Sequence, residues 1–154
     1  MITTLLICHA LLAVTLIGAL THQALSAWSP KSAVPGSLFA RFRNVHPAPY
    51  TNAIVVLFLS TATLGGLLYP SYRLGPRVVL ENFRLGTANG VFELKEHFVA
   101  IGLGLLPAYW YYWKRAASDR HAEARRILTT LLAGIAWWGF IVGHVLNNIR
   151  GFGL

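Results

Sequence analysis

Three histidines and two glutamates are the residues of this sequence whose types and spacing best suit cofactor chemistry: His9, Glu93, Glu96, His97 and His144. Imidazole is the usual axial ligand of haem iron in membrane cytochromes, and two imidazoles from separate helices can clamp one porphyrin. Three neutral imidazoles with one carboxylate also suit zinc, copper or non-haem iron. The sequence is therefore compatible with two hypotheses, a haem site and a site for a metal ion without porphyrin.

Helical spacing predicts that an acidic residue lies beside one of these histidines. Glu93 and His97 are four residues apart, so on a helix they share one face. The same face continues with Ala100, Gly104 and Pro107. Small residues let a second helix or a flat cofactor approach closely, and the spacing of Gly139 and Gly143 just before His144 favours the same close approach.

The composition of the chain predicts which secondary structure positions these residues. Of 154 residues, 55% are hydrophobic and 12% charged, about half the charged share of an ordinary soluble domain. The apolar residues form four blocks, at about 2–27, 53–69, 97–113 and 127–145. Each is close to the roughly 17–25 residues that a helix needs to cross a bilayer, and lipid requires helices because it offers backbone amides no partners. We predict an all-α integral membrane protein in which residues 1–154 form a single domain, a bundle of four transmembrane helices.

The first block could instead be a cleaved signal peptide, which would remove His9. A signal peptide has a basic start, a short apolar core and a small-residue cleavage site. Here no charged residue precedes Lys31, the apolar stretch is long, and the segment 24–27 is a weak cleavage match. We therefore expect the first helix to be retained.

Basic residues predict the orientation, because cytoplasmic loops retain Lys and Arg. With four spans, the loops 28–52 and 114–126 share one side and hold eight: Lys31, Arg41, Arg43, Lys114, Arg115, Arg120, Arg125 and Arg126. The other side holds five: Arg73, Arg77, Arg84, Lys95 and Arg150. This favours an N-out, C-out protein, in a bacterial inner membrane with both termini outside the cytoplasm. An aromatic run at 109–113, followed directly by basic residues, agrees with a helix leaving the membrane there. In this topology His9, His97 and His144 fall in one outer layer.

The connection 70–96 is long and mixed in character. It opens with Pro70, carries a turn at Gly75-Pro76, and continues as the apolar and charged stretch 78–85, which predicts a short helix in the membrane interface. Asn89-Gly90 predicts a turn into the third span.

Several classes are excluded or disfavoured. The net charge of +8 fits basic cytoplasmic loops beside anionic lipid headgroups, so the bilayer is the expected partner and no nucleic acid is needed. The single Cys8 cannot form an internal disulfide. Motifs of P-loop nucleotide binding, zinc proteases and serine hydrolases are missing from the sequence.

Three functions remain open. The first is a membrane subunit that binds haem b or another redox cofactor through two of His9, His97 and His144, and moves electrons at the outer face with a quinone as partner. The second is a membrane enzyme with a transition metal ion held by these three histidines and by Glu93 or Glu96. The third is a cofactor-free accessory or scaffold subunit of a larger complex; partner subunits or a homo-oligomer are expected in any case. Four short helices with inward histidines are broadly similar to membrane cytochromes b and respiratory anchor subunits, a likeness of layout without a shared motif.

Overall fold

The computed structural model describes residues 2–29, 36–37, 40–41, 47–115 and 118–152, and almost all of these are helical, with no strand among them. The helices are α1 (Ile2–Trp28), α3 (Pro47–Leu74), α4 (Pro76–Asn82), α5 (Gly86–Lys114) and α6 (Ala122–Phe152), and a 3-10 turn, η1 (Asp119–His121), precedes α6. The predicted all-helical class is confirmed for this part of the chain.

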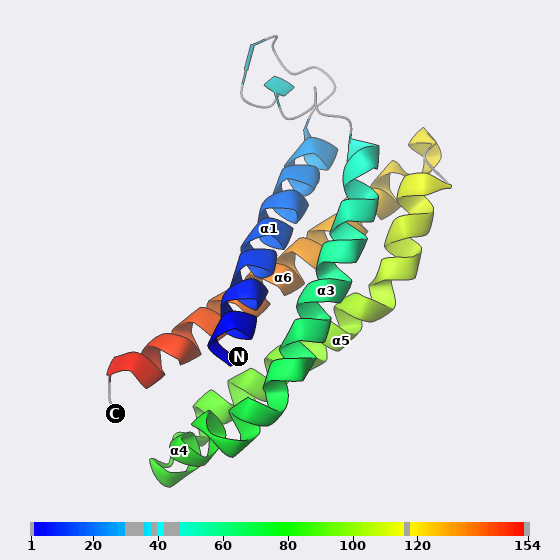
Figure 1. Cartoon of the computed structure of the whole chain (residues 1–154). Coiled ribbons are helices and arrows are strands. Elements are labelled where there is room, and N and C mark those ends of the chain that lie inside the picture. Colours follow the sequence, from blue (N-terminus) through cyan, green and yellow to red (C-terminus); the bar gives the residue numbers. More distant parts are fainter. Residues whose placement is uncertain (1, 30–35, 38–39, 42–46, 116–117, 153–154) are drawn as a thin grey trace.

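The four long helices alternate in direction (Figure 1). The start of α1 and the end of α6 therefore lie at the same end of the bundle as α4, here called the termini end, and the connections after α1 and α5 lie at the opposite, loop end. α1 packs against α3 and α6, and α5 packs against the same two helices. Each long helix thus has two helical neighbours around a common axis.

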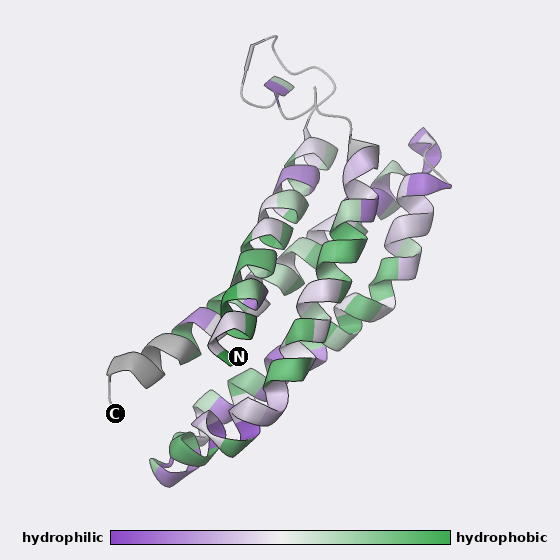
Figure 2. Ribbon diagram, in the orientation of Figure 1, coloured by the Kyte–Doolittle hydropathy of each residue, from purple (hydrophilic) through white to green (hydrophobic). Residues whose placement is uncertain are grey.

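Three of these helices are long and apolar enough to cross a membrane: α1, α3 from Pro49 onward, and the segment Asp119–Leu146. Apolar residues predominate along most of these helices (Figure 2). Large side chains such as Leu11 and Val56 are 64% and 61% exposed, which would be costly in water and is favourable in lipid. The predicted membrane protein is supported at this level.

The helix α5 is as long as the others, with 29 residues, but is not one of these three. Its first half carries Glu93, Lys95 and Glu96, and its second half contains Pro107 and an aromatic run. Both features lower its mean hydropathy. The prediction of a span at 97–113 falls on this helix.

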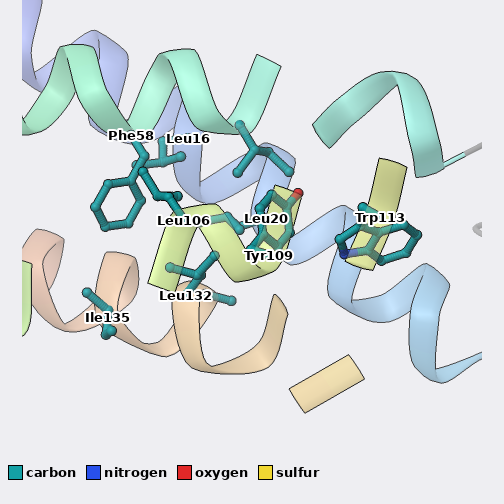
Figure 3. Packing of buried hydrophobic residues seen from close by; sticks show 10 residues of the cluster. Leu16, Leu20, Phe58, Leu106, Tyr109, Trp113, Leu132 and Ile135 are labelled. Atoms are coloured by element: carbon teal, nitrogen blue, oxygen red, sulfur yellow. The ribbon is translucent and has the colours of Figure 1, made fainter. Parts of the chain in front are cut away.

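The buried core lies in the half of the bundle nearest the loop end, and its side chains pack against one another (Figure 3). All four long helices contribute to it, with Leu16, Leu20, Ile54, Phe58, Leu106, Tyr109, Trp113, Leu132, Ala133 and Ile135. Two polar bonds cross this core: the Tyr109 hydroxyl donates to Gln23 Oε1 at 2.5 Å, and the Trp113 indole donates to Thr129 Oγ1 at 3.0 Å. The bonds satisfy polar groups that would otherwise be buried alone.

The connection 70–96 is more helical than its sequence predicts. α3 continues through Pro70 to Leu74, and α5 begins at Gly86, so the expected turn at Asn89-Gly90 is wrong. Asn89 instead accepts a hydrogen bond from the Tyr72 hydroxyl at 3.1 Å. This contact joins α3 to α5, and a turn signal read from neighbouring residues cannot predict it. A short helix does form between them, as α4.

Candidate functional site

His9 is the candidate ligand that faces the inside of the bundle. From α1 it packs on α3, where a Cβ built on Gly65 would lie 3.3 Å from its Cε1 atom, and the backbone of Thr61 lies beside the ring. The Nδ1 atom of His9 and the Oγ1 atom of Thr61 are both buried without a hydrogen-bond partner. Buried polar atoms are nearly always satisfied, so two orphans at one helix contact mark a place where a polar or metal-bearing group would be stabilised.

Lys95 brings charge to the same layer. Its side chain is only 14% exposed, its Nζ lies 3.0 Å from Glu96 Oε1 and 4.3 Å from the centre of the Phe92 ring, and its Cγ approaches Gly139 of α6. Both Lys95 and Glu96 act electrostatically on His9. An ionisable pair packed between helices of a membrane protein is a functional feature by default.

A shallow, open cleft of about 330 Å³ lies between α3 and α5 at the termini end. It is lined by Gly66, Tyr69, Glu93, Glu96 and His97. The His97 Nδ1–H donates to the main-chain oxygen of Glu93 at 2.8 Å, because a carbonyl can only accept. This bond fixes the tautomer and leaves Nε2 as the ring atom that would ligate a metal or accept a proton.

α4 holds one wall of this cleft in position. Arg77 donates to Glu81 at 2.7 Å and to Glu93 at 3.2 Å, so it ties α4 to α5. The hydrogen bond to Glu81 raises the pKa of the Arg77 guanidinium, which stays charged at any relevant pH. Behind the wall, the rings of Tyr72 and Phe92 stack with centroids 3.7 Å apart. The bond from Arg77 therefore holds the carboxylate of Glu93, one of the residues that line the cleft.

His144 is placed differently. It is exposed on α6 and stacks on Phe140 of the same helix, with centroids 6.0 Å apart. Beyond this level α6 runs away from α4 and from the start of α5 (Figure 1). Glu96 thus lines the same cleft as His97 and also lies close enough to His9 to act on it electrostatically. His144 lies apart from them, on the helix that diverges. Among the described residues, no group of three or more His, Cys, Asp or Glu side chains is arranged to hold a metal ion.

The remaining histidines lie far from this layer. His22 stacks on Tyr50 near the loop end, with centroids 5.4 Å apart, and His121 lies 3.2 Å from the Ser118 hydroxyl. His46 falls outside the described residues. Two of these positions therefore provide controls that sit at the opposite end of the bundle from His9.

Sequence reasoning missed two members of this region. The Lys95 side chain fills the space opposite Gly139, and the sequence signal was the small residue on the facing helix. The Thr61 hydroxyl is unpaired beside His9.

Comparison of the chain with protein-family models, with curated proteins and with solved structures finds no match. The function must therefore be argued from the site itself.

Proposed function

We propose that this chain is a four-span membrane subunit, N-out and C-out, that binds a b-type haem at the termini end and carries electrons there. In this proposal α5 also crosses the bilayer. Its 29 residues extend about 43 Å, longer than the roughly 30 Å hydrocarbon core. Apart from Lys114 at its last position, its charged residues occupy the first half, where Lys95 is paired with Glu96, and Glu93 with Arg77. Pairing lowers the cost of charge near the membrane edge.

The observation that carries the haem proposal is the buried, unpartnered Nδ1 atom of His9. A histidine that ligates a metal usually binds through one nitrogen while its other nitrogen contacts a backbone carbonyl or carboxylate, and the Thr61 backbone beside the ring suits that second role. Bound haem supplies one-electron redox chemistry. The Cε1 and Nδ1 atoms are the ring atoms nearest Gly65, so a group bound at Nδ1 would lie beside α3, where the glycine has no side chain.

The second axial ligand comes from His97 or His144, the two other histidines toward this end of the bundle. In His97 the bond from Nδ1–H to the Glu93 main-chain oxygen sets the tautomer, so Nε2 is the nitrogen that could bind the iron. His144 stands on the helix whose Gly139 meets Lys95. In either case the cationic Lys95 offers charge for a carboxylate of the porphyrin, and the open cleft beside Tyr69 admits a quinone from the lipid.

The test is an absorption spectrum of the detergent-purified chain, oxidised and reduced. We expect a Soret band that His9→Ala abolishes, and that either His97→Ala or His144→Ala abolishes as well. His22→Ala, at the loop end, is the matched control and keeps the band. A haem-free protein after expression with excess haem, or a band that survives His9→Ala, would overturn the proposal. A cysteine reporter at either end of the chain, labelled from outside the cell, tests the orientation.

A metal ion without porphyrin is the second candidate. Glu93, Glu96 and His97 line the same cleft, and because they are not arranged around a common point in the structure, their side chains would have to move to hold an ion. Carboxylate oxygens with imidazole suit zinc, manganese or iron, and a carboxylate could also act as general base. Elemental analysis of the purified chain separates this candidate from haem: bound metal without a Soret band, lost in His97→Ala, supports it. A chain free of both haem and metal that co-purifies with other membrane proteins is an accessory subunit.

A further inference from the structure

Three tryptophan–arginine pairs surround the loop end of the bundle, and the proposed haem site does not use them. Arg126 lies over Trp28 at 5.5 Å, Arg125 over Trp113 at 5.6 Å, and Arg115 over Trp110 at 6.0 Å, measured from the guanidinium carbon to the ring centre. These distances lie within the range of cation–π attraction.

Each of these indoles is anchored across a helix contact. Trp28 of α1 donates to Thr130 of α6 at 2.9 Å, and Trp113 of α5 donates to Thr129 of α6 at 3.0 Å. A third bond, at 3.2 Å, joins Trp110 of α5 to Asn52 of α3. The pairs therefore stand at three separate helix junctions, and the rings on which the guanidinium groups rest are held in place.

Arg126 and Arg115 are positioned without being neutralised. Arg126 donates through Nε to the main-chain oxygen of Ala27 at 2.9 Å, and its two terminal nitrogens make no hydrogen bond to the described residues. Within the described part of the chain, neither Arg126 nor Arg115 is paired with a carboxylate. Stacking uses the face of a guanidinium and leaves its donor edge for another group.

The local charge is strongly positive. Among the described residues of this end there are six basic side chains, Arg41, Lys114, Arg115, Arg120, Arg125 and Arg126, and two acidic ones, Asp119 and Glu123. Trp28 and Trp110 are themselves 56% and 38% exposed, although they are large aromatic side chains. Exposed indoles prefer the headgroup level of a bilayer, where one end of the ring is apolar and the other is hydrated.

We propose that the two pairs with exposed rings, Trp28 with Arg126 and Trp110 with Arg115, bind the phosphodiester headgroups of anionic phospholipids, whereas the ring of Trp113 belongs to the buried core. The guanidinium fork matches two phosphate oxygens, the indole beside it lies on the glycerol and upper acyl region, and the helix junction receives the chains. The site at the α1–α6 junction, formed by Trp28 and Arg126, is the better built of the two, because both members are fixed by hydrogen bonds to the neighbouring helix.

The experiment is native mass spectrometry of the delipidated chain, titrated with phosphatidylglycerol or phosphatidylcholine, at low and high ionic strength. We expect preferential retention of phosphatidylglycerol, weakened about fivefold by Arg126→Gln and by a similar factor in Arg115→Gln. Arg73→Gln is the matched control, an exposed arginine at the termini end, and leaves retention unchanged. High salt reduces the preference.

Three results would overturn the proposal. Equal retention of both lipids, equal loss in Arg73→Gln, or binding of inorganic phosphate as strongly as of the lipid would each remove the assigned site. Should Arg126→Gln unfold because the bond to Ala27 is lost, Arg115→Gln decides alone, since its side chain makes no hydrogen bond to the described helices. The measurement needs no haem, so its outcome is separate from that of the spectrum.

Discussion

Gly102 is the position at which one methyl group should most disturb the bundle. It lies on α5 and is packed directly against the ring of Phe58 from α3, which is 3% exposed. A Cβ built on Gly102 would collide with the Cζ atom of that ring and would lie 3.2 Å and 3.3 Å from the two Cε atoms. Real Cβ atoms do not tolerate such a contact, so Gly102→Ala must displace the ring or the helix.

The size of the effect follows from two opposing terms. Extra volume in a well-packed core costs about 1–3 kcal/mol, because side chains leave their preferred rotamers or the backbone shifts. Alanine in place of glycine within a helix returns up to about 1 kcal/mol. The ring cannot move freely, since it is enclosed with Leu16 and Leu106 in the core (Figure 3). We expect a net loss of about 1–2 kcal/mol in the free energy of unfolding.

The assay is denaturant unfolding in mixed micelles, followed by circular dichroism. Gly104→Ala is the matched control, because no atom lies within 4 Å of its added Cβ, and it should be as stable as the parent or slightly more so. In a Phe58→Leu background the same Gly102→Ala change should cost nothing further, since the obstructing ring is gone. Equal stability of the two alanine variants, or an undiminished loss in the leucine background, would refute the contact between α3 and α5.

Two further substitutions test polar contacts within the helices. Tyr109→Phe removes the donor to Gln23 inside the core and should lower the unfolding free energy by about 1–3 kcal/mol in the same assay, whereas Tyr111→Phe on the exposed face should not change it. Glu96→Gln removes the charge that partners the largely buried Lys95 and should cost about 2 kcal/mol, while the double change with Lys95→Met should recover most of it; no recovery would mean that the two side chains do not interact.

The existence of the helices could be predicted from sequence because lipid leaves the backbone few alternatives. Long apolar blocks in α1, α3 and α6 are visible in hydropathy alone, and the helices found there agree with the prediction. The helices extend beyond the predicted spans, as at Leu74 and Gly86, because their ends pack on each other outside the apolar region. Hydropathy predicts the apolar part of a helix and not its full length.

Which side chains point into the bundle and which point outward could not be predicted in the same way. The aromatic run at 109–113 predicts a belt at the membrane surface, and Trp110 and Tyr111 are indeed outward. Tyr109 and Trp113, however, turn inward one helical turn apart and form the polar bonds of the core. Which members of a continuous aromatic run are buried depends on the position of the neighbouring helices, and a single sequence does not contain that position.

The candidate site was predicted in part for the same reason. Spacing predicts one helical face for Glu93 and His97, and both line the same cleft of α5; that they bind a ligand there stays a prediction. That His9 is left with an unpartnered Nδ1 depends on the approach of α3 at Gly65, 56 residues farther along the chain. The pairing of His9 with His97 or His144 stays a prediction that the spectrum will test.

The two halves of the bundle differ in a way that bears on where a cofactor can enter. The buried core and its cross-helix bonds gather toward the loop end, whereas the layer of His9 and Lys95 lies at the edge of that core and the helices diverge beyond it (Figure 1). Local opening is easiest where few apolar contacts must break. Under the proposed function, a haem or quinone would enter from the termini end, while the cross-helix bonds of the tryptophans hold the loop end together. The buried polar atoms of His9 and Thr61 would then lie on the side from which such a ligand comes.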